Sequence, residues 1–283
     1  MVVTTGFFDG VHLGHRQILS RLVAEASARG VESLVVTFWP HPRAVLQQDA
    51  RGLRLLSTLE EKKELILDAG VDRVEVLPFT REFAALTAEE YLRMLREKFG
   101  ASLVIMGYDN RLGSDHRTAG ELPGVVPAGE PVLLGPSAGA ISSTKIRSAL
   151  AGGDVSLAAS MLGRLYALKG VVVEGNRLGR TIGFPTANMK IYEPLKQIPA
   201  GGVYSVEVET LGRTFRGMCN IGTRPTVSSG NDLSVETNIF DFDEDIYGLD
   251  ISVRFIRRIR DERRFDSLTS LSAQLSADRL ACR

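Results

Sequence analysis

Two histidines, His12 and His15, lie three residues apart shortly after the first apolar segment of the chain. They belong to the stretch Gly6-Phe7-Phe8-Asp9-Gly10-Val11-His12-Leu13-Gly14-His15, between an expected strand and an expected helix. A glycine-bearing turn at a helix N-terminus presents backbone N–H groups and a favourable dipole to phosphate oxygens. Imidazoles one turn apart can donate to the same anion. A lone histidine would more simply cap the helix, but the H-x-G-H spacing favours a phosphate site.

A second stretch with the chemistry of an anion site is Ile141-Ser142-Ser143-Thr144-Lys145-Ile146-Arg147. Ser142 or Ser143 could cap the helix that follows, which would place hydroxyl groups, backbone amides and Arg147 around a pyrophosphate. Taken alone, the stretch indicates an ordinary capped helix. Phosphate binding becomes the better interpretation because the stretch closes a region that opens with the two histidines.

A third stretch, from residue 175 to 188, carries four glycines before Pro185-Thr186-Ala187-Asn188. Glycines let a backbone approach phosphates closely, and Thr186 and Asn188 supply neutral oxygens to a hard cation. No Gly-Lys-Ser/Thr follows, so this is not a Walker A loop. All four histidines lie at or before His116, so a general base in the second half must be a carboxylate. Composition alone does not choose among the acids there.

Short apolar segments alternate with amphipathic ones over the first half of the chain. We expect strands at 2–5, 33–38, 73–77, 102–106 and 132–134, and helices at 16–29, 59–69 and 88–99. Ser57 with Glu60, and Thr87 with Glu90, have the spacing of capping boxes. Strands separated by helices predict a mainly parallel sheet covered on both faces.

The pattern changes after about residue 165. Tyr204, Val206 and Val208 alternate with polar residues, as do Ile251 and Val253, and glycine- and proline-rich turns separate these segments. Such alternation predicts an antiparallel barrel or sandwich, and only the segment after 267 again indicates a helix. We therefore predict two domains, residues 1–158 and 159–283.

These stretches resemble motifs of known enzyme families. The stretches at 6–15 and 141–147 resemble signatures of the nucleotidylyltransferase superfamily, and 175–188 resembles the G-x-x-x-G-R-x-x-G-F-P-T-A-N signature of riboflavin kinases. The segments 37–42 and 107–113 resemble flavin-end and metal-end motifs of FAD synthetases. The whole chain is thus similar to the bifunctional riboflavin kinase/FMN adenylyltransferases, the bacterial FAD synthetase family. It departs from the family at Phe7 (often Asn), Asn110 and Leu112 (often Phe), and Asn238 (often His).

This resemblance implies a Rossmann-like α/β nucleotidylyltransferase domain with a parallel sheet, followed by an antiparallel β-barrel riboflavin kinase domain with a C-terminal helix. It implies phosphorylation of riboflavin to FMN and adenylylation of FMN to FAD, with ATP as the donor, Mg²⁺ as the cation and pyrophosphate as a product. The partners are small-molecule flavins and adenine nucleotides.

Residue roles also follow from the resemblance. The catalytic residues are His12, His15, Arg147 and Glu236. The ATP phosphates are bound by Gly6, Phe8, Asp9, Gly14, Ser143, Thr144, Gly175, Gly179, Arg180 and Gly183. Flavin is bound by Phe38, Pro40, Pro42, Arg111 and Asn220. Mg²⁺ is bound by Asp109, Thr186 and Asn188.

The composition limits the other classes of function. Among 283 residues, 34 Lys and Arg balance 34 Asp and Glu, which argues against a nucleic-acid binder. The arginines between 254 and 264 are interrupted by Asp261 and Glu262, which indicates a solvated strand face. Cys219 and Cys282 have no metal-ligand spacing, and no signal peptide or membrane span is visible. We expect a soluble cytoplasmic monomer or weak homo-oligomer.

Two alternatives remain open at this level. One is an enzyme with a single active domain, in which case Asn110 marks the adenylyltransferase as the inactive one. The other is a flavin-binding or regulatory protein without catalysis. The presence of Asp109, Thr186, Asn188 and Glu236, which a binder would not need, argues against it.

Overall fold

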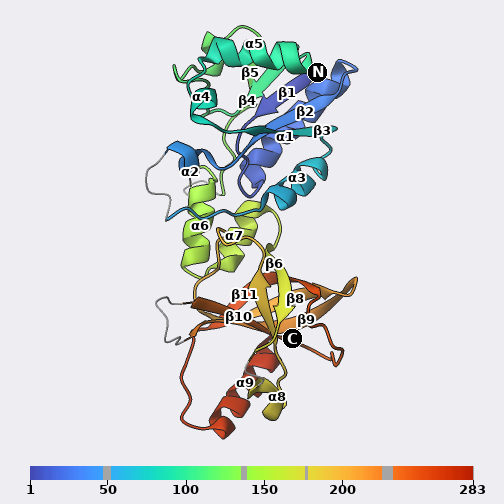
Figure 1. The fold of residues 1–283 in the computed structure, drawn as a ribbon, viewed down its shortest axis with the longest axis vertical. Helices are drawn as coiled ribbons and strands as arrows, with labels where there is room; N and C mark the ends of the chain where they lie inside the picture. Colours follow the sequence, from blue (N-terminus) through green and yellow to red (C-terminus); the bar gives the residue numbers. More distant parts are fainter. Residues whose placement is uncertain (47–51, 135–138, 176–177, 225–231, 283) are drawn as a thin grey trace. The chain divides into compact units, whose positions relative to one another are not determined.

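A computed structural model describes residues 1–46, 52–134, 139–175, 178–224 and 232–282 (Figure 1). The chain forms two compact units, Met1–Ser143 and Thr144–Arg283. Helix α7 (Val155–Leu162) belongs to the second unit, where it packs against strands β11 and β6 of the barrel described below. The predicted domain boundary after residue 158 stays a prediction.

The first unit is built on a five-stranded sheet in the order β3-β2-β1-β4-β5, and every neighbouring pair is parallel. The strands are β1 (Val2–Thr5), β2 (Ser33–Trp39), β3 (Arg73–Pro78), β4 (Leu103–Met106) and β5 (Val125–Pro127). The α/β prediction is confirmed for this half. The strand expected at 132–134 is wrong: β5 lies earlier, and Leu133 makes only an isolated bridge to Ala140.

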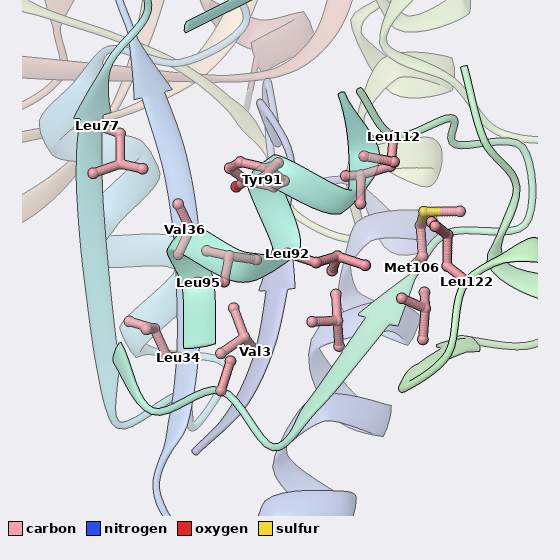
Figure 2. Packing of buried hydrophobic residues seen from close by; sticks show 14 residues of the cluster. Val3, Leu34, Val36, Leu77, Tyr91, Leu92, Leu95, Met106, Leu112 and Leu122 are labelled. Atoms are coloured by element: carbon pink, nitrogen blue, oxygen red, sulfur yellow. The ribbon is translucent and has the colours of Figure 1, made fainter. Parts of the chain in front are cut away.

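Helices cover both faces of this sheet. The helices of the unit are α1 (Leu13–Ala28), α2 (Pro42–Leu46), α3 (Leu59–Leu67), α4 (Arg81–Ala84), α5 (Ala88–Phe99) and the short 3-10 helix η1 (Ala119–Glu121). Figure 2 shows Tyr91, Leu92 and Leu95 of α5 packed over Val3 and Val36 of the strands. A second cluster joins Leu19 and Leu22 of α1 and Ile66 of α3 to Val35 and Ile105 on the opposite face. Side chains that alternate along the strands therefore contribute to two hydrophobic cores, one on each face of the sheet.

The helix starts follow local hydrogen-bonding rules. Thr87 and Glu90 form the capping box expected for α5. The box at α3 uses Thr58 and Glu61, one residue later than Ser57 and Glu60. Ser57 is instead engaged elsewhere, because its hydroxyl accepts a hydrogen bond from Gly10 N at 3.0 Å.

The second unit is a closed six-stranded antiparallel barrel in the order β10-β7-β6-β11-β8-β9. Its strands are β6 (Tyr166–Val173), β7 (Ala187–Ile191), β8 (Gly202–Thr210), β9 (Arg213–Arg224), β10 (Asp232–Ile239) and β11 (Asp250–Arg260). The remaining helices are α6 (Ser143–Ala151), α8 (Leu178–Thr181) and the C-terminal α9 (Leu268–Cys282). The predicted barrel and terminal helix are confirmed.

Helix α9 is fixed to the barrel by arginines of the strands. Arg260 of β11 donates from Nε and Nη2 to both carboxylate oxygens of Asp278, at 2.7–3.0 Å, and Asp278 is 2% exposed. Arg216 of β9 donates to the Cys282 carbonyl at 3.0 Å. The arginines of β11 thus include Arg260, which anchors α9 through the buried Asp278, as well as residues on a solvated face.

We expect Asp278→Ala to destabilise the barrel by about 1–3 kcal/mol, because it leaves the half-buried Arg260 guanidinium without its charged hydrogen-bond acceptor. Urea unfolding followed by far-ultraviolet circular dichroism measures the change. Glu209→Ala, an exposed acid on β8, is the control and should change stability by less than about 0.5 kcal/mol. Equal stabilities of Asp278→Ala and the wild type would show that this pair does not anchor α9.

Candidate active sites

The first candidate site lies where the strand order of the parallel sheet reverses. Strand β1 stands between β2 and β4, so the loops that leave the carboxyl ends of β1 and β4 meet at this switch point. Open α/β sheets bind their ligands at such a crevice. Residues 6–12 follow β1, and 107–113 follow β4, so the topology brings two of the predicted motifs together.

The two histidines form a stacked pair at the start of α1. Helix α1 begins at Leu13, and His12 is its N-cap, with Nδ1 accepting from His15 N at 3.3 Å. The imidazole rings are parallel to within 15°, with centroids 3.6 Å apart. A Cβ on Gly14 would lie 3.2 Å from the His12 ring, so a small residue is favoured at this position. Because Nδ1 of His12 accepts, its neutral form carries the proton on Nε2 and can donate there.

Burial and nearby positive charge disfavour the protonated form of His15. Burial lowers the pKa of His15 well below its ordinary value, and the positive charges of His12 and Lys62 lower it further. Its Nδ1 is buried and has no hydrogen-bond partner among the described residues. A stacked imidazole pair does not readily hold two charges, so an anion would be needed to stabilise its protonated forms.

Buried contacts fix the loop before the histidines. The Asp9 carboxylate, 4% exposed, accepts from Leu56 N at 2.8 Å and from Ser57 N at 3.2 Å, and the Asp9 carbonyl accepts from Ser143 Oγ at 3.0 Å. Phe8 is buried with φ 53° and contacts the His15 ring edge-on at 5.2 Å. The Asp9 carboxylate and the Phe8 ring therefore shape the loop, and their role in phosphate binding stays a prediction.

The stretch that resembles I-S-S-T-x-I-R forms the start of α6. Helix α6 begins at Ser143, and Arg147 donates from Nη2 to the Thr144 hydroxyl at 3.3 Å. Arg147 is half-buried and Thr144 is exposed. Ser143 is the last residue of the first unit and contacts the loop that carries the histidines.

A cavity of about 570 Å³ adjoins the same loop at Gly6. Phe38, Phe79, Phe83 and Tyr91 give it an aromatic wall, and the hydroxyls of Thr5 and Tyr91 are hydrogen-bonded at 2.6 Å. Of the predicted flavin residues, Phe38 and Arg111 line the cavity, whereas Pro40 and Pro42 are not among its lining residues. Asn110 and Leu112, the departures from the family, lie in its wall.

Asp109 is an exposed carboxylate on the turn after β4. It makes no hydrogen bond or ion pair with any described residue. It is not among the residues that line the aromatic cavity. The structure therefore does not place Asp109 in this cavity, and its role as a metal ligand stays a prediction.

The second candidate site is a row of side chains across three barrel strands. Glu236 of β10 is directly opposite Asn188 of β7 on one side and Asn220 of β9 on the other. Directly opposed residues of antiparallel strands point to the same face of the sheet. Barrel closure therefore gathers three predicted site residues from positions 188, 220 and 236.

Two cavities flank this row. One, of about 560 Å³, is lined by Glu236, Asn220 and Asn238, together with Leu271 and Leu275 of α9. The other, of about 480 Å³, is lined by Arg180, by Thr237 and Ile239 of β10 and by residues 242–247. Thr186 lines both cavities, which places it between them. Successive residues of β10 thus serve alternate cavities, as strand geometry requires.

The glycines of the 175–188 stretch permit close contacts around Thr186. A Cβ on Gly175 would lie 2.1 Å from Nδ2 of Asn188, and one on Gly179 would lie 2.2 Å from the Phe184 carbonyl. Gly183 has φ 82°, a conformation that favours glycine. Residues 176–177 of this stretch, and 225–226 of the segment that follows Asn220, lie outside the described residues.

Asn238 ties β10 to the Pro185-Thr186 segment. It is 4% exposed, its Nδ2 donates to the Pro185 carbonyl at 2.6 Å, and its Oδ1 is buried without a partner among the described residues. We expect Asn238→Ala to destabilise the barrel by about 1–3 kcal/mol, because it removes the buried hydrogen bond between β10 and the Pro185-Thr186 segment. Urea unfolding measures the change, and a stability equal to that of the wild type would contradict it.

Sequence patterns did not indicate Lys62. It lies in α3, is 1% exposed, and donates from Nζ to the Phe7 carbonyl at 3.0 Å, inside the loop that precedes the histidines. In the sequence it is one of two adjacent lysines in an amphipathic helix, where a solvated role is the ordinary expectation. The aromatic residues Phe79, Phe83 and Tyr91 were also missed, because they have the pattern of core residues.

Comparisons with known proteins agree with this geometry. The family model described as riboflavin kinase matches residues 162–283, and the one described as FAD synthetase matches residues 1–123. The bifunctional riboflavin kinase/FMN adenylyltransferase of Bacillus subtilis is 35% identical over 98% of this chain and 90% of its own. That of Escherichia coli K12 is 39% identical over 100% of this chain and 91% of its own. A solved structure titled a macrolide-efflux protein from Streptococcus pneumoniae is 36% identical, with a TM-score of 0.93 over 100% of this chain and 93% of that one.

Fold, sites and comparisons define a two-domain flavin enzyme in which a nucleotidyl-transfer domain precedes a riboflavin kinase barrel. The chain belongs to the bifunctional riboflavin kinase/FMN adenylyltransferase family.

Proposed function

We propose that the two activities of the chain, riboflavin kinase and FMN adenylyltransferase, reside in the two sites described above and act in succession. The barrel transfers a phosphoryl group from ATP to riboflavin and gives FMN and ADP. The first unit then lets the FMN phosphate attack the α-phosphorus of a second ATP, which gives FAD and pyrophosphate. Neither step needs a covalent enzyme intermediate, because positioning and charge stabilisation can carry both transfers.

In the barrel, Glu236 is the general base that accepts the proton of the riboflavin 5′-hydroxyl. It lines the larger cavity, whose walls include the apolar side chains of Leu271 and Leu275, so this cavity suits the flavin ring. Thr186 lies between the two cavities, where the transferred phosphoryl group would pass. ATP then occupies the smaller cavity, where Arg180 offers a positive charge to its phosphates.

The residues beside Glu236 fit Mg²⁺ bound together with ATP. Thr186 and Asn188 supply neutral oxygen donors, which this cation accepts, and the Asn188 amide is held against the Gly175 backbone. Within the part of the chain that the structure describes, no three His, Cys, Asp or Glu side chains gather into a metal site. Bound together with ATP, Mg²⁺ would be held by Thr186 and Asn188 along with substrate phosphates and water, and it would supply neutralisation of the charge on the phosphate oxygens.

In the first unit, His12 and His15 donate hydrogen bonds to the phosphate oxygens of ATP as charge develops at the α-phosphorus. Backbone N–H groups at the start of α1, near Gly14, add to the same field. Ser143, whose hydroxyl donates to the Asp9 carbonyl of this loop, is a ligand for the pyrophosphate group that leaves. Phosphate binding by Thr144 and Arg147 stays a prediction. Asp109 at the end of β4 is the ligand proposed for Mg²⁺ in this site.

FMN occupies the aromatic cavity of the first unit. Its rings of Phe38, Phe79 and Phe83 suit the isoalloxazine, and Arg111 adds a positive charge. The cavity adjoins the histidine loop at Gly6, so a phosphate at that end of the flavin reaches the adenylyl-transfer centre. The polar Asn110 changes the contacts of the flavin and leaves the reaction in place.

The observation that carries the assignment is the row Asn188–Glu236–Asn220, which joins a carboxylate base to the predicted cation ligand. Incubation of the purified protein with riboflavin, ATP and Mg²⁺, with the flavins separated over time, tests it. FMN that appears first and is then converted to FAD supports both sites. FMN alone would contradict the assignment for the first unit, and no conversion of riboflavin by a folded protein would contradict the assignment for the barrel. The same incubation with FMN in place of riboflavin then tests the first unit by itself.

We infer that the protein works in the cytoplasm as a monomer or weak homo-oligomer, on small-molecule substrates. Both cysteines are free and buried, and burial raises the pKa of the Cys219 thiol to about 12, so neither supports an exposed redox role. In residues 1–46, 52–134, 139–175, 178–224 and 232–282 no helix combines the length and apolar character needed to cross a membrane.

A further inference from the structure

Side chains from two elements donate hydrogen bonds to the carbonyl of Phe7, which lies five residues before His12. Nζ of Lys62, on α3, donates to it at 3.0 Å, and the Thr37 hydroxyl on β2 donates to it at 3.3 Å. The Lys62 ammonium also stands 3.9 Å from the centroid of the Phe7 ring. Lys62 therefore connects α3 to the loop that ends in the histidine pair.

Burial of this ammonium is costly and calls for a chemical explanation. Lys62 is 1% exposed, and the Phe7 carbonyl is its hydrogen-bond acceptor among the described residues. A leucine or methionine would fill a core position without the desolvation cost of a charge. Exposed lysines are abundant on such helices, and the neighbouring Lys63 is one of them. Packing therefore does not explain the positive charge of Lys62, whereas its hydrogen bond to the Phe7 carbonyl of the loop does.

The charged groups around Lys62 come from three elements. Asp9, in the loop, favours the charged ammonium and is itself bound to the amides of Leu56 and Ser57. His15, at the start of α1, is reached by the positive field of Lys62, as it is by that of His12. His41, after β2, contacts the Phe7 ring at 4.1 Å. Lys62 and the imidazoles of His15 and His41 thus surround the loop with groups that can interact favourably with a polyphosphate, in addition to the carboxylate of Asp9.

We propose that Lys62 is a positioning residue of the adenylyl-transfer site: its ammonium group fixes the His12–His15 loop at Phe7 and adds a buried positive charge that favours binding of the ATP polyphosphate. This inference rests on the proposed function of the first unit. Lys62 acts through the loop and through its field, which is stronger in a water-poor site than at a surface.

The test compares Lys62→Met and Lys62→Arg with Lys63→Met, a matched change at the next position of the same helix. With FMN and ATP supplied, we expect Lys62→Met to lower kcat/KM for ATP about 10²-fold, the usual effect of losing one preorganised charged or donor group. Lys62→Arg should recover at least part of that loss, and Lys63→Met should keep the wild-type value. Riboflavin phosphorylation should be unchanged in all three.

A pH profile distinguishes a charge role from a purely structural one. Burial lowers the pKa of Lys62 to about 8, so the charged fraction falls as pH rises through that value. Because kcat/KM reports the free enzyme, its value for ATP should decline through about pH 8 in the wild type. In Lys62→Arg, which keeps its charge, the decline should move to higher pH.

Several outcomes would overturn the inference. They are wild-type kcat/KM in Lys62→Met, an equal loss in Lys63→Met, or a wild-type profile that stays flat through pH 8. The fluorescence of Trp39, the single tryptophan, reports whether Lys62→Met is folded. If this variant does not fold, the pH profile of the wild type still tests the inference. A wild type that makes no FAD from FMN would refute the proposed function itself, whereas normal FAD formation by Lys62→Met would refute the role of Lys62 alone.

Discussion

Replacement of His15 by alanine is expected to lower FAD formation from FMN by about 10²–10³-fold, the usual effect of removing one preorganised donor. His15 is stacked on His12 at 3.6 Å, and its Nδ1 has no partner among the described residues, so the imidazole is placed for a ligand rather than for packing. Formation of FMN from riboflavin should keep its wild-type rate. Chromatographic assays with FMN or riboflavin as the starting flavin measure the two activities separately.

Ser20→Ala, on the exposed side of the same helix, is the control for His15→Ala and should leave both activities unchanged. The sign of the pH effect adds a second readout. Because the pKa of His15 is lowered well below its ordinary value, loss of its neutral form begins only at low pH. On the acid side of the pH profile, the fall in kcat/KM for ATP that depends on His15 should therefore occur at pH values well below the ordinary pKa range of histidine. Wild-type FAD formation by His15→Ala would contradict the proposed role.

Glu236→Gln is expected to do the reverse. Loss of the carboxylate should lower FMN formation by about 10²–10⁴-fold, the range for a positioned general base. Glutamine keeps the size of the side chain and its place between Asn188 and Asn220, so the barrel should remain folded. FAD formation from added FMN should be preserved.

Glu209→Gln is the matched control, because it replaces a carboxylate by a carboxamide at an exposed position of β8. It should retain both activities. Circular dichroism should show that both variants are folded. If either His15→Ala or Glu236→Gln removed both activities from a well-folded protein, the assignment of one reaction to each unit would be wrong.

Much of this account could be predicted from the sequence, because the motifs are local. Gly14 and His15 follow from spacing along one turn, and Thr186 and Asn188 from one tetrapeptide. Thr87 and Glu90 also predicted a helix start that the structure confirms. In each case the physical cause acts between residues that are close in the chain.

The rest depends on contacts between distant segments. Lys62 meets Phe7 across 55 residues, and nothing in the pattern of α3 shows which of its lysines is buried. Ser57 and Thr58 both stand three residues before a glutamate, and the choice of Thr58 as the cap follows from the bond of Ser57 to Gly10. The register of Glu236 against Asn188 is likewise set by barrel closure, which no local pattern specifies.

The most direct test of the central claim mixes the two defective variants. His15→Ala alone should convert riboflavin to FMN and stop, and Glu236→Gln alone should leave riboflavin unchanged. Under the proposed succession of the two sites through free FMN, the mixture should form FAD from riboflavin and ATP. A mixture that forms no more FAD than either variant alone, while each keeps its single activity, would contradict two sites that work in sequence through free FMN.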